Sequence, residues 1–119
     1  MGEYGQAVHM ERIVTGNASS AEDLTIYISG TTTEYTLQAD EHVVITDVLI
    51  MSEAGGDVKL LADDESGGEY IVWGNLDAKD SLERSFHTPY VCPKGVVPEF
   101  MGGNNQGLEA CICEGYITV

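Results

Sequence analysis

The chain has 119 residues, 43% of them apolar and 21% charged, which is the composition of one globular domain and excludes a disordered segment. Its longest apolar run, near Val43–Met51, is interrupted by Thr46 and Asp47 and is too short for a membrane-spanning helix. Five Lys and Arg against twenty Asp and Glu give a net charge of −15. Nucleic acids and anionic membranes both require basic patches on a partner, so we expect neither as a partner.

The first residues contain no basic region followed by an apolar segment, so they predict no secretory signal. We therefore expect the protein to fold in the cytoplasm in which it is made. The cysteines, Cys92, Cys111 and Cys113, are odd in number, which together with a reducing compartment argues against a disulfide framework.

The N-terminal region predicts one strand and little else. Gln6–Thr15 is rich in strand-forming residues but breaks strict alternation, which favours an arm that meets different neighbours along its length. Ser19 and Glu22 fit a helix capping box with room for one turn at most. We expect residues 1–23 to form an N-terminal arm and strand, and residues 24–119 to form a single sandwich domain.

The next elements include the strongest strand of the chain. Leu24–Ser29 alternates apolar and polar residues, which predicts a half-buried strand, and Thr33–Gln38 is expected to pair with it. His42–Met51 is apolar on both parities, which predicts a central strand or one covered on both faces. Asp47 shares its parity with the apolar Val43, and a buried Asp is costly, so we expect a β-bulge there that reverses the register.

Short strands separated by Gly-rich turns continue to the C-terminus. Asn75–Asp80 is expected to be a loop or one helical turn, Pro98 marks an edge strand, and a bulge is expected near Gly115. Eight or nine strands with almost no helix predict an all-β fold, an antiparallel β-sandwich of the jelly-roll type with about eight strands and an N-terminal arm. The expected strands of this half are Val58–Ala62, Glu69–Gly74, Leu82–Phe86, Tyr90–Cys92, Val96–Phe100 and Leu108–Val119.

The cysteines are the candidates for a zinc site. Cys111 and Cys113 lie two apart and so share one face of a strand, and with Cys92 and a histidine they form a weak zinc candidate. Zinc knuckles place a C-x₂-C pair in a turn, whereas small buried cysteines are common in cores. The second interpretation is favoured, and we expect no metal and no cofactor.

The sequence contains no pattern typical of an enzyme. His9, His42 and His87 are far apart and form no metal-binding spacing. Ser85 and His87 share a strand face, but no nucleophile elbow or phosphate-binding loop accompanies them. We expect no catalytic residues and no enzymatic activity.

Two surface features have alternative interpretations. The acidic turn 63–65, Asp-Asp-Glu, lacks the spacing of an EF-hand calcium loop and is expected to be solvated. Trp73 with Tyr70 and Tyr90 could form a sugar-stacking platform, but strand aromatics more often pack in a core, which is the favoured interpretation.

The residues from about Asp40 to Val119 show a pattern similar to that of a known family. The pattern comprises the long apolar strand with its Asp, a Gly-Gly hairpin, Val58-Lys59-Leu60-Leu61, Tyr70-Ile71-Val72-Trp73, Phe86-His87-Thr88-Pro89, Lys94-Gly95-Val96, Asn104-Asn105-Gln106-Gly107 and Glu114-Gly115-Tyr116-Ile117. It resembles the small jelly-roll proteins that decorate or cement the capsids of tailed bacteriophages, often as trimers. The resemblance implies a structural virion protein on the capsid exterior, made in the host bacterial cytoplasm, that binds the major capsid protein and itself as a homotrimer.

The arm would then add a strand to the sheet edge of a capsid subunit, with a partner interface formed by Tyr4, Val8, Met10 and Ile13. One alternative is a carbohydrate- or receptor-binding sandwich on a virion or tail, which predicts that Trp73 or Tyr90 is exposed. An acidic mimic of DNA ranks last, because the carboxylates are scattered through turns and strand exteriors.

Overall fold

The computed structural model describes residues 5–15, 20–62, 69–103 and 107–119. These residues form nine strands arranged in two antiparallel sheets, which confirms the predicted all-β sandwich. The described part of the chain has no helix long and apolar enough to cross a membrane. The strands are β1 Ala7–Thr15, β2 Glu22–Asp23, β3 Thr25–Ile28, β4 His42–Ser52, β5 Gly56–Ala62, β6 Glu69–Leu76, β7 Asp80–Val91, β8 Glu99–Met101 and β9 Leu108–Thr118.

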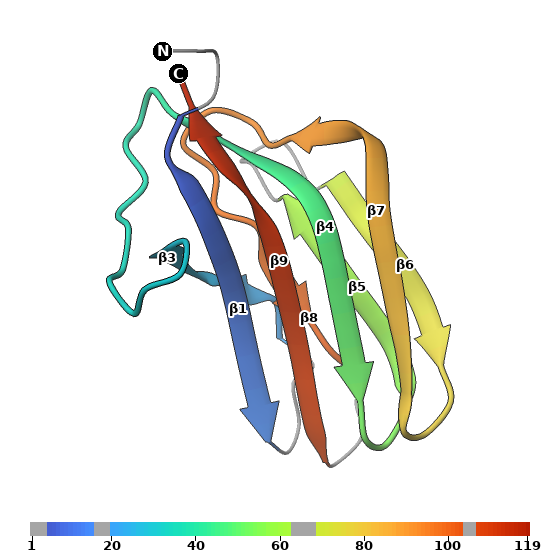
Figure 1. Cartoon of the computed structure of the whole chain (residues 1–119). Helices are drawn as coiled ribbons and strands as arrows, with labels where there is room; N and C mark the ends of the chain where they lie inside the picture. Colours follow the sequence, from blue (N-terminus) through green and yellow to red (C-terminus); the bar gives the residue numbers. More distant parts are fainter. Residues whose placement is uncertain (1–4, 16–19, 63–68, 104–106) are drawn as a thin grey trace.

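The strand order is that of a jelly roll. One sheet runs β3-β1-β9-β4-β7 and the other β2-β8-β5-β6, and the two stack face to face (Figure 1). The pairs β1 with β9, β2 with β8, β4 with β7 and β5 with β6 are nested along the chain, as in a long hairpin folded over on itself. Such nesting is the jelly-roll topology, and β3 is an added strand at the edge beside β1.

Strand β1 is an inner strand of the larger sheet, so the prediction of an N-terminal arm is wrong for Ala7–Thr15. Its first half pairs with β3 on one side and with β9 on the other. Val8 and Met10 point into the core, whereas Ile13 is exposed. The alternation in burial is therefore regular, and the sequence pattern is broken because Arg12 lies on the inner face and Ile13 on the outer face.

The bulge predicted in β4 is confirmed. The register of β4 against both of its neighbours shifts between Ile45 and Asp47. Before the shift Val43 and Ile45 are buried, and after it Val48 is buried while Asp47 is exposed. Apolar residues of both parities therefore point into the core, because the extra residue of the bulge reverses the alternation partway along the strand. The central position predicted for the strand is also confirmed, because β4 lies between β9 and β7.

Several predicted boundaries differ from the structure. Thr33–Gln38 is a loop with a single bridge, Glu34 to Tyr27, rather than a strand. The two expected strands around Phe86 and Tyr90 are one edge strand, β7, which contains Pro89 without a pairing partner on its outer side. The bulge expected near Gly115 lies on the opposing strand β4, and the capping residue Ser19 lies outside the described residues.

The two sheets enclose one hydrophobic core to which almost every strand contributes. Phe100 of the short strand β8 is the largest of its fully buried side chains. Leu82 of β7 fills the space above Gly74 of β6, where an added Cβ would lie 2.6 Å from a Leu82 methyl carbon. The glycine therefore allows the two sheets to approach each other at this edge.

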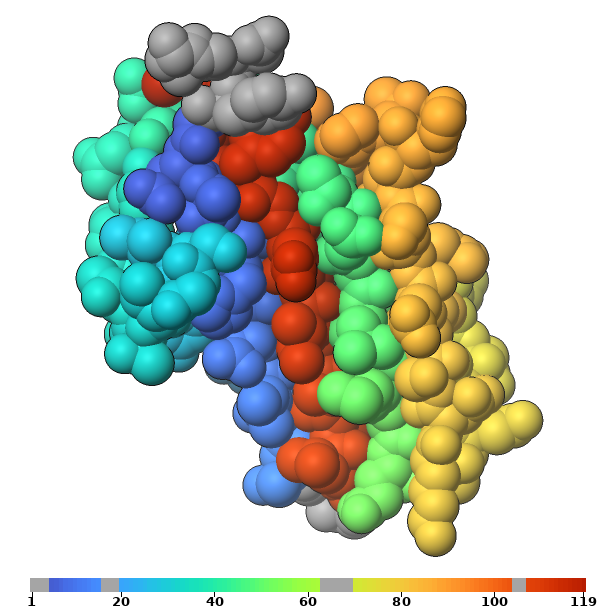
Figure 2. Space-filling view, viewed as in Figure 1, coloured from blue at the N-terminus to red at the C-terminus, as the bar shows by residue number. Residues whose placement is uncertain are grey.

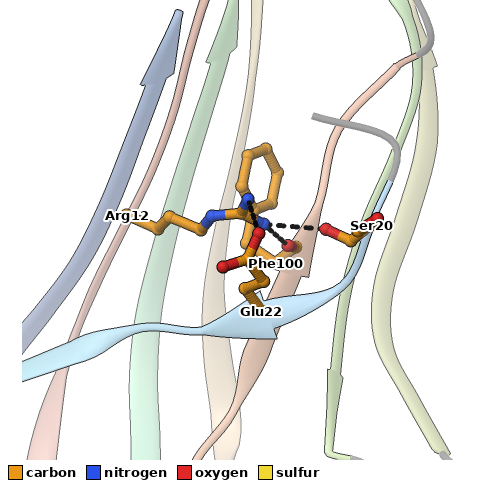
Figure 3. Close-up of polar contacts among 4 residues, drawn as sticks. All are labelled: Arg12, Ser20, Glu22 and Phe100. Atoms are coloured by element: carbon orange, nitrogen blue, oxygen red, sulfur yellow. Dashed lines mark hydrogen bonds and ion pairs between the residues drawn. The ribbon is translucent and has the colours of Figure 1, made fainter. Parts of the chain in front are cut away.

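Arg12 closes the opposite side of the sandwich, where β3 no longer covers β1 (Figure 3). Its guanidinium donates hydrogen bonds to the carbonyl oxygens of Phe100 and Ser20 and to the Glu22 carboxylate, the last two at 2.9 Å. The Arg12 side chain is only 14% exposed, whereas that of Glu22 is 67% exposed. One side chain of the larger sheet thus holds β2 and β8 of the smaller sheet.

We expect Arg12→Met to lower the free energy of unfolding by about 2–3 kcal/mol, because two backbone carbonyls lose a charged donor. Arg12→Lys should recover little of it, since an ammonium cannot reproduce the planar guanidinium fork. Glu22→Gln is the control and should cost less than about 1 kcal/mol, because its carboxylate is solvated. Urea unfolding followed by circular dichroism measures all three, and equal losses for Arg12→Met and Glu22→Gln would contradict the interpretation.

Candidate functional site

The three cysteines lie in the core. All three are buried, and the sulfur atoms of Cys111 and Cys113 are 3.9 Å apart on the inner face of β9. The hydrogen bond with Cys111, together with burial, raises the pKa of the Cys113 thiol well above its ordinary value. A metal ligand or nucleophile must be a thiolate. Among the described residues, no group of three or more His, Cys, Asp or Glu is placed to hold a metal ion.

The histidines are dispersed, as their spacing predicts. His9 stacks on Tyr27 with ring centroids 5.1 Å apart, and Nδ1 of His42 lies 2.8 Å from the carbonyl oxygen of Cys92. The Ser85 hydroxyl donates a hydrogen bond to the Asp47 carboxylate of β4 at 2.7 Å, rather than to His87. The acidic turn 63–65 lies outside the described residues.

The partner interface predicted at Tyr4, Val8, Met10 and Ile13 is wrong for Val8 and Met10. Val8 and Met10 are buried in the core at 1% and 0% exposure, so they are not available to a partner. Tyr4 lies outside the described residues. Ile13 alone of the four is placed on the surface, where it is 59% exposed. The error arose because a strand in the middle of a sheet has the same local sequence pattern as a strand that pairs with another protein.

The outer face of the larger sheet carries an apolar cluster. Ile13, Ala110 and Met51 are aligned in register across β1, β9 and β4, and Leu108 lies beside them at the start of β9. Three of these side chains are exposed large hydrophobic groups, and Ala110 is buried between its neighbours. Figure 2 looks onto this face, where β1, β9, β4 and β7 lie side by side. We call Ile13, Met51, Leu108 and Ala110 the apolar row.

The same face becomes more polar with distance from the apolar row along the strands. The next aligned row combines Ile112 and Leu49 with glutamates on the outer strands, and the row after it includes Glu114 and Asp47. Hydrogen bonds donated by Ser85 and Thr46 lower the pKa of Asp47, so this end stays anionic at neutral pH. Beside the apolar row is a hollow of about 450 Å³, lined in part by Met51, Leu108 and Ala110 and by polar residues of the β6–β7 turn.

The outer face of the smaller sheet carries an aromatic platform, which we define as Lys59, Tyr70 and Trp73. The two ring centroids are 5.7 Å apart with the ring planes inclined at 42°, and the Lys59 Nζ lies 5.6 Å from the Tyr70 centroid and 5.5 Å from that of Trp73. Tyr70 is 55% and Trp73 is 59% exposed.

The favoured prediction that these aromatics pack in the core is therefore wrong for Tyr70 and Trp73. Tyr90 is partly buried against the core and is not part of the platform. The exposure of Trp73 is what the carbohydrate-binding alternative requires.

Comparisons with known proteins assign no family to the chain. No family model matches it, and no curated protein matches it. Solved structures that share some likeness include xylanase 10B of Clostridium thermocellum, a CBM22-1–GH10 fragment complexed with xylohexaose, at 15% identity and a TM-score of 0.33. They also include the coconut allergen cocosin, at 18% identity and a TM-score of 0.23. The alignments cover 98% and 90% of this chain but only 27% of each of those chains, and at these scores neither bears on function.

Proposed function

We propose that the protein is a structural virion protein that decorates and stabilises the capsid of a tailed bacteriophage, acting as a homotrimer bound to the major capsid protein on the outside of the shell. The proposal rests on the similarity of residues 40–119 to that family, with which the observed jelly-roll strand order is consistent. No catalytic role is assigned to any residue.

The observation that carries the proposal is the exposed apolar row on the outer face of the larger sheet. A protein of net charge −15 repels its own copies, so self-association needs contacts that do not depend on opposite charges. Exposed apolar side chains that are contiguous rather than scattered mark such interfaces. Ile13, Met51 and Leu108 supply this contact, and the hollow beside them gives a partner side chain a place to insert.

The test is the solution mass of the purified protein by light scattering at physiological salt. We expect a mass near three times the 12.8 kDa of one chain. The double variant Ile13→Glu, Leu108→Glu should weaken association about a hundredfold or more and give monomers, because closed symmetry repeats each added charge at every interface.

The matched control is Val91→Glu, which adds the same charge to the same sheet at an exposed position outside the apolar row. It should leave the mass unchanged. A parent protein that is monomeric in solution and does not cosediment with expanded phage shells would contradict the proposal. Dissociation by Val91→Glu alone would place the interface elsewhere.

A second candidate function is a carbohydrate-binding module on a virion or tail. The observation that favours it is the exposed aromatic platform on the opposite sheet. The two functions use different faces of the molecule, so a decoration protein that also binds a glycan is sterically consistent with the fold.

A further inference from the structure

We propose that the aromatic platform is a binding site for a neutral glycan, with Trp73 as the stacking surface for one pyranose ring. The inference develops the second candidate function, on which it rests, and is independent of capsid binding. It specifies the site, the charge class of the ligand and the residues that recognise it.

The stacking surface comes from the exposed rings. A pyranose presents an apolar face of C–H groups and a rim of hydroxyls, and an indole ring matches the apolar face. Trp73 and Tyr70 expose more than half of their surface. Their centroids, 5.7 Å apart, are separated by a distance comparable with the width of one sugar ring. Exposed rings of this size are costly to leave in water, so their position calls for a ligand.

The polar groups around the rings match the hydroxyl rim. Lys59 lies directly opposite Trp73 in the sheet and places an ammonium donor beside both rings. On the same face, the next outward pair is Asp57 with Asn75, whose amide donates to the Asp57 carboxylate. This pair provides a preoriented donor and acceptor next to Trp73, which are the groups that recognise neighbouring hydroxyls.

The position of the platform leaves room for a longer ligand. β6 is the edge strand of the smaller sheet, so no further strand of that sheet flanks Tyr70 and Trp73 in the described residues. A polysaccharide chain can therefore extend past the site on the open side. Tyr70 and Trp73 are each paired with β5, and the register shift between them brings both rings to the outer face, which holds the platform in place before binding.

The charge of the molecule selects a neutral ligand. The net charge of −15 opposes any polyanion, and the carboxylate of Asp57 lies close to the site. The platform contains one cation, Lys59, and its ammonium group already interacts with both rings. A protein partner is disfavoured, because protein interfaces have an apolar centre depleted of charge, whereas this platform is bordered by charged and amide groups. The apolar row on the opposite sheet fits a protein partner better.

The test uses the fact that Trp73 is the only tryptophan of the chain, so its fluorescence reports on the site directly. Affinity electrophoresis in native gels containing neutral polysaccharides of glucose, xylose, mannose, galactose or N-acetylglucosamine first selects a ligand by retardation. The corresponding neutral oligosaccharide is then titrated into the full chain, and a charged polyuronate oligosaccharide is titrated in parallel. We expect saturable changes in Trp73 emission with a neutral sugar and none with the polyuronate.

The variants separate the site from the function. Tyr70→Ala should weaken binding about tenfold, and Trp73→Ala, followed by calorimetry, should abolish it. The matched control Val91→Ala removes a side chain from the other sheet that is 55% exposed, as Tyr70 is, and that lies outside the apolar row, so it should leave affinity unchanged. Glycan binding that survives Tyr70→Ala and Trp73→Ala would overturn the site but not the second function. Retardation by no polysaccharide would overturn both, and binding of the polyuronate alone would overturn the neutral ligand class.

Discussion

Gly115→Ala is expected to abolish folding or to lower the free energy of unfolding by more than about 4 kcal/mol, a large part of the roughly 5–15 kcal/mol available to a domain. A Cβ on Gly115 would lie 1.8 Å from the carbonyl oxygen of Val44 and 3.2 Å from the Cα of Ile45. Both are backbone atoms of the adjacent central strand, so no side-chain movement can relieve the clash. Soluble yield and urea unfolding followed by circular dichroism measure the loss.

The reason for this close contact is the bulge in β4. Gly115 of β9 faces Ile45, immediately before the register shift, where the extra residue displaces the β4 backbone towards its neighbour. Gly30→Ala is the control, because Gly30 adopts a φ of +76° with no atom within 4 Å of the added carbon. It should cost only about 1 kcal/mol. A Gly115→Ala protein as stable as Gly30→Ala would disprove the packing described here.

Phe100→Ala should lower the free energy of unfolding by about 3–5 kcal/mol, since it combines the lost transfer energy of a buried ring with an unfilled cavity. Phe100 is fully buried, and β8 around it is only three residues long. The ring therefore supplies most of the anchorage of a strand that connects β2 to β5. The cavity should also reduce the cooperativity of unfolding measured by urea titration, because the Arg12 contact is made to the carbonyl of the same residue.

Trp73→Ala is the matched control, because it truncates an aromatic side chain of the same sheet that is 59% exposed. It should cost less than about 1 kcal/mol, as it loses only ring and cation–π contacts at the surface. A comparable loss in the two variants would mean that Trp73 is part of the core. The same control shows whether the glycan-site variants remain folded.

The β4 bulge could be predicted from the sequence because its signal is local. In a regular strand, a carboxylate that alternates in step with apolar residues would be buried. A bulge that shifts the register exposes it instead, and the bulge costs less free energy than burying the charge. The fold class was predictable for a related reason, since alternating short strands between glycine turns are compatible with few architectures. Thr33–Gln38 pairs with β3 as predicted, but only through the bridge from Glu34 to Tyr27, and its failure to form a full strand was not predictable from so short a segment.

Whether a candidate surface residue is exposed depends on which side of its strand faces the core. In the run Tyr70-Ile71-Val72-Trp73 both parities are apolar, so the sequence does not indicate which pair of side chains is buried. The pairing of β6 with β5 decides it, because its register shifts between Val72 and Tyr70, so that Tyr70 and Trp73 are both exposed while Val72 is buried. The same applies to Val8 and Met10, which the sequence permits on a partner surface and which the neighbours β3 and β9 place in the core.

The sequence by itself determined the net charge of −15, the all-β class and the position of the β4 bulge, because strand patterning and a misplaced carboxylate act within a short stretch of chain. Only the tertiary structure decided that β1 is an inner strand, that Trp73 and Tyr70 are exposed, and that Ile13, Met51 and Leu108 gather on one face. These features depend on pairing between residues up to about a hundred positions apart, such as Ala7 with Tyr116, and no local pattern specifies such pairs.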